Sequence, residues 1–409
     1  MSANQPTQIQ IEASFPSDTA LVRDMFTQAA GEFVRYRNTT PEIWAASTDW
    51  FLEPWGRDTF IALPGLLFPM KRFEEAKDIF RAFGEYEQNG IIPNRILPDK
   101  TLYNTVDASL WFVHAVQQYL EWNPDTASAK EILPTLRSIV KHYQKGTSYH
   151  HFEYDQHIYM DTDGLIFSPA QATWMDADPS GNGTQMVTPR QGKCVEINAL
   201  WYGALQFVAE LETKKKAEDL QRLASKVKLS FNRKFWNKEE QCLKDVIDGD
   251  PHSGAIRPNQ IFAISHGDDL LSGARQRQVL KSVTQDLLTP AGLRTLSPRD
   301  SHFEGFYNTY APMQEKDLAY HQGTIWPWLI GPYCDALVKV GQGKGKYDFA
   351  IHDQLKDVLA PLVDFCLESE YESLPEVFSG NKPYTPGGTR SQAWSVAEIL
   401  RVMVQYGVL

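Results

Sequence analysis

Acidic side chains stand beside tryptophan or proline in long segments that lack regular hydrophobic spacing. Asp176 directly follows Trp174 and Met175 in a Gly- and Pro-rich stretch, and Glu376 follows Pro375 in another. A carboxyl packed against an indole loses hydration, which raises its pKa and allows it to act as an acid near neutral pH. Two carboxyls in one cleft suit glycoside hydrolysis, in which one protonates the leaving oxygen and the other activates a water.

Other polar residues stand where loops enter predicted helices. They are Arg57, Asp58, Asn104, Asp107, Glu196 and Asn198. A short polar side chain at such a position can cap the first helical turn, and a charged one can form a salt bridge. The same position also directs the side chain toward a cleft at the helix end. The capping and the functional interpretations both remain open for these residues.

A histidine-containing segment, AYHQGTIWPW, precedes another predicted helix. It contains His321, Gln322, Trp326 and Trp328. A lone histidine without a second ligand at a suitable spacing does not make a metal site, so we expect a hydrogen bond from His321 to a ligand hydroxyl instead. The chain also lacks the GxGxxG, GxxxxGK[ST], GxSxG and HExxH motifs. We therefore expect no cofactor and no metal.

Helical hydrophobic spacing dominates the elements that must position these residues, and strand signals are nearly absent. We expect an all-α chain with about twelve helices. Their expected ranges are 18–35, 58–69, 73–87, 106–122, 130–146, 195–212, 215–235, 257–265, 270–288, 323–340, 346–367 and 391–406.

The connections between the expected helices alternate between short and long. Short ones lie around 70–72, 123–126, 213, 267 and 342, and long ones at 36–57, 88–105, 147–194, 236–256, 289–322 and 368–390. Long irregular loops in compact domains are usually functional. The alternation predicts a closed ring of six helical hairpins, an (α/α)6 toroid, with the long loops on one face forming the active site. We expect residues 1–15 to be a flexible lead-in and 16–409 a single catalytic domain.

Composition excludes several classes of function. The 409 residues are 42% hydrophobic and contain no apolar run long enough to span a membrane. A net charge of −11 disfavours nucleic acid as a partner, because phosphate binding needs a basic surface. The start of the chain lacks a secretory signal pattern. Four cysteines without CxxC pairing indicate free thiols, so we expect a cytoplasmic protein. Eleven tryptophans either build a large core or line a cleft for a sugar ring.

Seven motifs in order along the chain resemble a known family. They are WGRDTFIALPGLL, GIIPNR with YNTVDASLWF, TWMDAD with VTPRQGKCVEINALWY, IRPNQIFAIS, LLTPAGLRTLSP, AYHQGTIWPWLIGPY and QAWSVAEILR. Together they resemble the C-terminal amylo-α-1,6-glucosidase module of glycogen debranching enzymes, over nearly the whole chain. The resemblance implies an (α/α)6 toroid related to glucoamylase-like and trehalase-like enzymes, which invert the anomeric centre.

The resemblance also implies roles for individual residues. Asp176 matches the family's general acid and Glu376 its general base, while Arg57 and Asp58 resemble the pair that binds hydroxyls of the non-reducing glucose. Further residues of that subsite, by the same resemblance, are Trp55, Asn104, Asp107, Trp174, His321, Gln322 and Trp326. Lys193 and Glu196 lie in the family's GKxVEINALW segment and are included as substrate-binding residues.

The leading hypothesis is an inverting α-glucosidase that removes α-1,6-linked glucose from a glycogen or limit-dextrin branch stub, or from a small α-glucoside. An inverting enzyme requires carboxyl groups ~6.5–9.5 Å apart. One alternative keeps the toroid but makes the protein a sugar epimerase or isomerase with histidine as proton carrier. Others are a hydrolase of another small α-glycoside and a non-catalytic carbohydrate-binding protein.

Overall fold

The computed structural model describes residues 7–97, 99–252, 254–341 and 349–409. The short connection expected around 342, the start of the helix expected at 346–367 and the first residues of the expected lead-in lie outside these ranges. The described residues contain one continuous cluster of buried hydrophobic side chains, which includes residues from Ile9 to Val408. No helix among them is long and apolar enough to cross a membrane.

The described part of the chain is mainly helical, as predicted, with thirteen α-helices. They are α1 (Thr19–Gly31), α2 (Gly56–Leu67), α3 (Phe73–Glu85), α4 (Ala108–Trp122), α5 (Thr126–Lys145), α6 (Val195–Glu210), α7 (Lys214–Lys234), α8 (Phe262–Ser265), α9 (Gly273–Asp286), α10 (Met313–Tyr320), α11 (Ile330–Gly341), α12 (Phe349–Glu368) and α13 (Ala393–Gln405). Short 3₁₀ turns at Pro258–Ile261 and Pro327–Leu329 precede α8 and α11. Each predicted helix has a counterpart, and α10 is the one that the prediction missed.

The helices differ in how much of their surface is buried. In α5, Ile132, Leu136 and Ile139 are buried on one face, and Asp125 caps the first turn by accepting hydrogen bonds from the N–H groups of Ala127 and Ser128. By contrast, every residue of α2 and nearly every residue of α6 is buried. A helix that is apolar on all sides must be surrounded by other elements.

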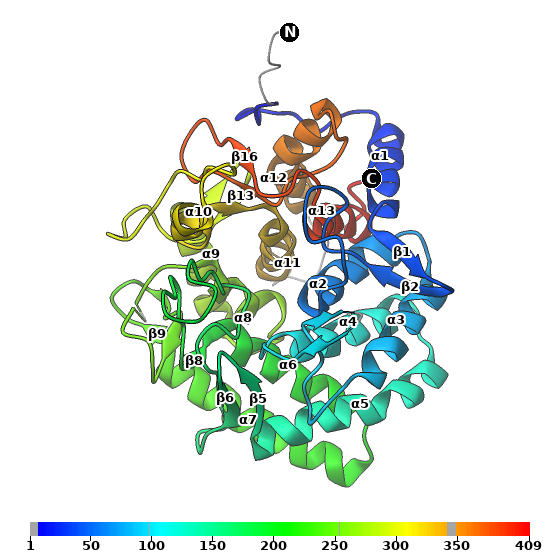
Figure 1. Ribbon diagram of the computed structural model, residues 1–409, viewed down its shortest axis with the longest axis vertical. Helices are drawn as coiled ribbons and strands as arrows, with labels where there is room; N and C mark the ends of the chain where they lie inside the picture. Colours follow the sequence, from blue (N-terminus) through cyan, green and yellow to red (C-terminus); the bar gives the residue numbers. More distant parts are fainter. Residues whose placement is uncertain (1–6, 98, 253, 342–348) are drawn as a thin grey trace.

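The buried helices contact one another in a closed order. Helix α2 packs against α4, α4 against α6, α6 against α8, α8 against α11, α11 against α13, and α13 against α2. Helices α1, α3, α5 and α7 lie farther from the centre of the molecule in Figure 1. The starts of α2 and α4 lie side by side in this arrangement, because Arg57 in the first turn of α2 binds Asp107 at the start of α4.

Sixteen short strands in the described residues were not anticipated by the prediction of an all-α chain. They are β1 (Val34–Arg37), β2 (Thr40–Ile43), β3 (Arg95–Ile96), β4 (Thr101–Leu102), β5 (Thr147–His151), β6 (Tyr154–Met160), β7 (Ile166–Phe167), β8 (Lys193–Cys194), β9 (Trp236–Asn237), β10 (Cys242–Leu243), β11 (Val246–Ile247), β12 (Leu288–Thr289), β13 (Gly292–Arg294), β14 (Ile325–Trp326), β15 (Val377–Phe378) and β16 (Pro386–Gly387). All pair antiparallel, and the largest sheet has the order β12-β13-β14-β15-β16. Most have only two residues, too few to give an alternating pattern in the sequence.

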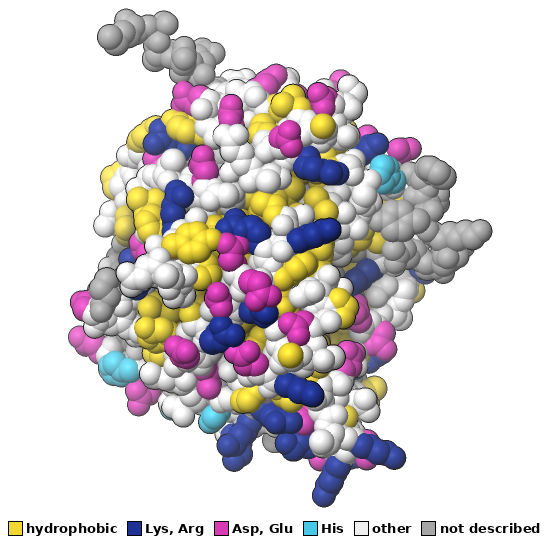
Figure 2. Space-filling model, turned by 90° about the vertical axis from the view of Figure 1, so that its right-hand side faces the viewer, with side chains coloured by type: hydrophobic (Ala, Val, Ile, Leu, Met, Phe, Trp, Pro, Cys, Tyr) yellow, Lys and Arg dark blue, Asp and Glu magenta, His cyan; other side chains and the backbone are white. Residues whose placement is uncertain are grey.

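The side of the molecule that carries α1, α3 and the β1–β2 hairpin is shown in Figure 2. Acidic and basic side chains are interspersed over most of it among hydrophobic and uncharged ones, and several basic side chains gather at its lower end.

Candidate active site

The first turn of α2 holds the first group of expected site residues. Trp55 precedes the helix in an extended conformation and pairs with Arg95, whose guanidinium lies 4.6 Å from the centre of the Trp55 ring. Gly56 follows, and a Cβ there would lie 2.1 Å from the carbonyl oxygen of Pro93. Only glycine therefore allows this close approach, which fixes where Arg57 emerges.

Arg57 joins two of the expected carboxylates. Its Nε donates to Asp107 Oδ2 at 2.8 Å, and its Nη1 donates to Asp176 Oδ2 at 2.9 Å. Asp107 occupies the N-cap position of α4, yet its side chain makes no capping hydrogen bond. The capping interpretation of Asp107 is therefore not what the structure shows, because its carboxylate is bound to Arg57.

Asp58 lies in the first turn of α2 and is 8% exposed. Burial raises the pKa of Asp58 to about 7, Arg57 opposes this rise, and the nearby charges of Glu376 and Asp176 add to it. A carboxyl close to half protonated near neutral pH can both donate and accept a hydrogen bond. That property suits contact with a sugar hydroxyl.

Glu376 lies just before β15, and its side chain is enclosed by Tyr320, Thr389 and Gly388. Its Oε1 accepts a hydrogen bond from the Tyr320 hydroxyl, and its Oε2 accepts one from the N–H of Thr389 at 3.1 Å. Gly388 packs directly against it, and a Cβ at that position would lie 2.2 Å from Oε2. Burial raises the pKa of Glu376 to about 7, while the bonds from Tyr320 and Thr389 favour its ionised form.

Asp176 and Glu376 share close neighbours although 200 positions separate them along the chain. The charges of both raise the pKa of Asp58 and, together with burial, that of the Tyr320 hydroxyl. The side chain of Asp176 is 35% exposed, whereas Glu376 is 2% exposed. Both carboxyls thus act on the same two groups, Asp58 and Tyr320, and the side chain of Asp176 is nearer to solvent.

Burial also raises the pKa of Asp176, but the hydrogen bond and charge of Arg57 act in the opposite direction. In the unliganded site, the Asp176 carboxylate is thus held by a salt bridge. Glu376 receives hydrogen bonds from neutral donors only. Protonation of Asp176 is favoured whenever Arg57 turns from it toward another partner.

Stacked and edge-on aromatic rings form the floor beneath these carboxyls. Trp174 lies edge-on to His321 at 5.4 Å and to Trp326 at 5.3 Å, and His321 stacks on Trp326 at 5.3 Å. Trp174 Nε1 donates to Asn259 Oδ1 at 2.8 Å. His321 is fully buried, and its pKa is held well below 6.5 by burial and by three nearby arginines. It is therefore a neutral imidazole.

Several buried polar atoms around this floor have no hydrogen-bond partner among the described residues. They are Trp55 Nε1, Arg57 Nη2, Asn104 Oδ1, Asp107 Oδ1 and both ring nitrogens of His321. Unsatisfied buried polar groups are costly, and those of Arg57 and Asp107, which bind each other, indicate a place that binds water or a polar ligand. Gln322 differs, because its Oε1 accepts a bond from Arg257 at 2.6 Å.

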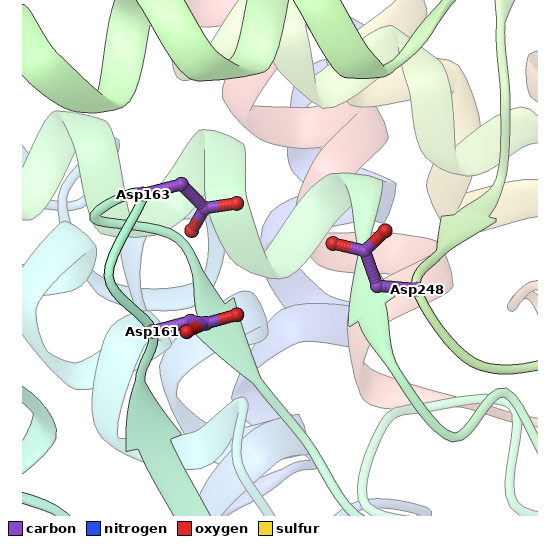
Figure 3. A group of neighbouring side chains, drawn as sticks. All are labelled: Asp161, Asp163 and Asp248. Carbon is purple, nitrogen blue, oxygen red and sulfur yellow. The ribbon is translucent and has the colours of Figure 1, made fainter.

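Lys193 binds three aspartates and none of the candidate site residues described above. Its Nζ lies 2.8 Å from an oxygen of Asp161, of Asp163 and of Asp248, and Lys234 Nζ also binds the last two. Figure 3 shows the three carboxylates around a common space. The two ammonium groups lie where a metal ion would bind, so the donor set is neutralised from within the chain. Lys193 thus joins the ends of β6 and β11 to β8.

Glu196 likewise has a partner inside the protein. It lies in the first turn of α6 and binds both terminal nitrogens of Arg190, at 2.5 and 2.7 Å. Arg190 also binds Asp245, whose Oδ1 accepts from Asn259 at 2.7 Å. The salt-bridge interpretation of Glu196 is the one the structure supports, and this buried network stands behind the Trp174 side of the floor.

Comparison with known proteins places the chain in a family. The model of the family described as amylo-alpha-1,6-glucosidase matches residues 28–401. The chain belongs to this glycoside hydrolase family. It is 24% identical to the glycogen debranching enzyme of Saccharomyces cerevisiae, in a match that covers 86% of this chain and 29% of the yeast enzyme. The chain therefore spans less than a third of that relative's length.

Two solved structures share the fold of this family member. A rhamnosidase from Klebsiella oxytoca with rhamnose bound superposes with a TM-score of 0.60 at 14% identity, covering 98% of this chain and 66% of the other. An uncharacterized conserved protein from Thermus thermophilus gives a TM-score of 0.65 at 15% identity, covering 93% and 99%. At these identities the likeness concerns the fold alone.

Sequence reasoning missed three residues of the site of this amylo-α-1,6-glucosidase family member. Tyr320 and Thr389 bind Glu376, and Asp317 lies one helical turn before Tyr320 on α10. Burial raises the pKa of Asp317 to about 6, with a further contribution from the charge of Asp176. Tyr320 is part of the AYHQG motif, but nothing in the sequence signals that its hydroxyl meets a carboxyl 56 positions later.

Replacement of Tyr320 by Phe should displace the pH profile of the enzyme. The variant loses a hydrogen bond to ionised Glu376, so the pKa of Glu376 rises and the acidic limb of kcat/KM moves up by about one pH unit. We expect KM to change little. Tyr307→Phe is the matched control, since Tyr307 stacks on Tyr320 at 5.7 Å without bonding Glu376 in the described structure. An unshifted limb in Tyr320→Phe would show that the bond does not tune Glu376.

Replacement of Lys193 by Met should destabilise the protein without raising KM. We expect the free energy of unfolding to fall by about 2–3 kcal/mol, less than for a fully buried pair because Asp161 and Asp248 are 42% and 45% exposed. The pKa of Asp161 is lowered to about 2, mainly by its bond to Lys193. The stabilisation is therefore present above pH ~3.9, the pKa of an aspartate in the unfolded chain, and is lost as the pH falls toward 2.

Chemical denaturation at pH 7 and pH 3.5 measures this difference, which should shrink at the lower pH. Lys228→Met is a suitable control, because Lys228 pairs with Asp269 at the surface. A Lys193→Met enzyme of normal stability and raised KM would instead assign Lys193 to substrate binding.

Proposed function

We propose that this protein is an inverting α-glucosidase that hydrolyses α-1,6-linked glucose at a branch stub of glycogen or limit dextrin, or in a small α-glucoside. The family membership supports hydrolysis of a glycosidic bond. The observation that carries the proposal is that the Trp326 ring lies 5.3 Å from Trp174 and 4.8 Å from Tyr320. Asp176 follows Trp174 by two positions and Glu376 binds the Tyr320 hydroxyl, so the same ring supports two carboxyls of different exposure.

In the proposed mechanism the two carboxyls act in one displacement. Asp176, the more exposed carboxyl, protonates the glycosidic oxygen of the leaving group. Glu376 accepts a proton from a water, whose oxygen attacks the anomeric carbon from the opposite face of the ring. Tyr320 and Thr389 each occupy one oxygen of Glu376, so an in-plane lone pair of the carboxylate stays available to orient the water.

The proposed substrate contacts involve polar groups at the start of α2. We propose that the hydroxyls of the non-reducing glucose bind Arg57, through its unpartnered Nη2, and Asp58. A substrate that draws Arg57 away from Asp176 raises the pKa of Asp176 as it binds, and so prepares the acid. Trp55, Asn104, Asp107 and Trp174 complete the proposed subsite. His321, Gln322 and Trp326 support it from below.

Lys193 and Glu196 are proposed to act at a distance from the sugar. Their partners are the Asp161–Asp163–Asp248 cluster and Arg190, respectively. These bonds hold β8 and the start of α6 in place. The two residues stabilise the segment behind Trp174 and make no contact with glucose.

The fold that we propose is an (α/α)6 toroid forming a single catalytic domain of residues 16–409. It is supported by the closed order of contacts from α2 through α4, α6, α8, α11 and α13 back to α2. The proposed location is the cytoplasm, in keeping with four buried cysteines that form no disulfide.

An epimerase or isomerase would need a histidine able to carry a proton near neutral pH. The pKa of His321 lies well below 6.5, and its ring is enclosed by Trp174 and Trp326. This observation favours the hydrolase over the epimerase.

A glucose-release assay across isomaltose, panose, phosphorylase-limit dextrin, maltose and sucrose tests the substrate assignment. We expect release from isomaltose and from the α-1,6 stubs of limit dextrin, with maltose at least tenfold slower in kcat/KM. Preference for maltose or sucrose would replace the assignment by that of a hydrolase for another small α-glucoside. Deuterium uptake from solvent into an uncleaved sugar would restore the epimerase.

A further inference from the structure

A second hollow lies beside the segment that carries Glu376. Its volume is about 640 Å³, within the range of ligand-binding pockets. Four parts of the chain line it: Thr7 near the start of the chain, the end of α12 with the segment after it, the loop before α10, and the segment around β16. Strand β16 is the edge strand of the five-stranded sheet. Neither Asp176 nor Glu376 lines it.

The hollow nevertheless shares a wall with the candidate active site. Pro375 and Gly388 both line it, and these residues respectively precede Glu376 in the chain and pack against its side chain. Thr309, also in the lining, accepts a hydrogen bond from the Gly388 N–H at 3.1 Å. A ligand in the hollow would therefore lie next to the site without occupying it.

Two tyrosines give the hollow its aromatic character. Tyr310 is 95% exposed, although a large ring normally has a packing partner in a folded protein. Tyr371 has one ring face covered by Arg390, whose guanidinium lies 4.4 Å from the ring centre. Rings with a free face pack against the C–H faces of sugars.

The charges around the hollow exclude an anionic ligand. Arg390 is bound to Asp49 at 2.7 Å, so its charge is already neutralised. Glu368 and Glu370, in contrast, line the hollow from exposed positions. The combination of exposed rings, acceptor carboxylates and a neutralised cation suits a neutral polyhydroxyl chain, whose hydroxyls donate to the carboxylates.

We propose that this hollow is a second, non-catalytic binding site for a stretch of linear α-glucan, which anchors a polymeric substrate next to the active site. That the sugar is an α-glucan rests on the proposed function; the preference for a neutral oligosaccharide rests on the hollow alone. Small substrates that reach only the active site gain no affinity from this hollow.

Calorimetric titration with maltoheptaose tests this site, because maltoheptaose is linear and has no α-1,6 bond. The variants are Tyr310→Ala and Tyr371→Ala. The Tyr310 ring is exposed, so its removal should leave the fold intact. Tyr154→Ala is the matched control, since Tyr154 is a 53% exposed tyrosine on β6. We expect each hollow variant to weaken maltoheptaose binding about fivefold or more, and the control to bind as wild type does.

Kinetics on two substrates complete the test. Both hollow variants should raise KM for limit dextrin and leave KM and kcat for isomaltose unchanged. The proposal is overturned if wild type does not bind maltoheptaose, if both variants bind it normally, or if isomaltose turnover falls in parallel, which would make the hollow part of the catalytic site. An enzyme that binds maltoheptaose through Tyr310 but releases no glucose from isomaltose or limit dextrin would refute the proposed function and leave this binding site established.

Discussion

Asp176→Asn should abolish release of glucose from isomaltose while leaving the fold intact. Asparagine has nearly the same shape and can still accept the bond from Arg57 Nη1, but it cannot deliver a proton to the leaving oxygen. General acid catalysis contributes about 10²–10⁴-fold, so kcat should fall by about that factor. Steady-state kinetics with isomaltose and a thermal unfolding curve measure the two halves of this prediction.

The leaving group decides whether Asp176 acts as the acid. α-Glucosyl fluoride departs as fluoride and needs little protonation, so Asp176→Asn should hydrolyse it within about tenfold of the wild-type rate. Asp178→Asn serves as a control, because the Asp178 carboxylate binds the N–H groups of Ser180 and Gly183 within its own turn. It should keep wild-type kcat on both substrates. Loss of both activities in Asp176→Asn would rule out a role limited to proton donation.

Glu376→Gln should eliminate hydrolysis of isomaltose and of α-glucosyl fluoride alike. Attack by water needs a base whatever the leaving group, and glutamine cannot accept the proton. Its amide oxygen can still accept a hydrogen bond from Tyr320 or Thr389, so the side chain should keep its position. We expect kcat to fall by about 10³-fold or more on each substrate, measured under the same conditions as for Asp176→Asn.

Glu372→Gln provides the comparison for this substitution. Glu372 is an exposed glutamate four positions before Glu376, and it should be replaceable without loss of activity. In the wild type, the pKa of Glu376 of about 7 predicts that kcat/KM declines as the pH falls below 7, because the base becomes protonated. Glu376→Gln with full activity on the fluoride would remove Glu376 from the role of base.

The two variants together distinguish the proposed roles from the reverse assignment, in which Glu376 is the acid and Asp176 the base. In the unliganded site Asp176 is salt-bridged to Arg57, while the pKa of Glu376 is raised to about 7, and this pattern by itself would suit Glu376 as the acid. Exchanged roles predict that Glu376→Gln hydrolyses the fluoride and Asp176→Asn does not. The proposed roles predict the opposite, because in the proposed mechanism the substrate draws Arg57 away from Asp176.

The helical framework could be predicted because its hydrophobic spacing is local. The apolar stripe of α5 and the uniformly apolar segments of α2 and α6 appear in the sequence with the period of a helix. Helix α10 was missed because only Ala319 among its eight residues is buried, so it shows no stripe. The two-residue strands are set by pairings across long loops, which leave no local pattern.

The candidate site was predictable to the extent that its residues lie in recognisable motifs. Arg57, Asp58 and Asp107 do lie together, but only the structure reveals that Arg57 links Asp107 to Asp176. Lys193 and Glu196 come from an equally distinctive motif, yet Lys193 binds Asp248, from a segment that no spacing rule connects to it, and Glu196 binds Arg190 of its own motif. A motif thus identifies the residues that matter without distinguishing a ligand contact from an internal salt bridge.

The anomer of glucose that forms first tests the central claim most directly. The claim is that Asp176 and Glu376 act on opposite faces of the sugar in a single displacement, with a water between Glu376 and the anomeric carbon. Methyl α-isomaltoside suits this test, because its leaving group is methyl α-glucoside and adds no free glucose. Proton NMR during the first minutes of its hydrolysis, before mutarotation, should show β-glucose. Formation of α-glucose as the first product would contradict the account.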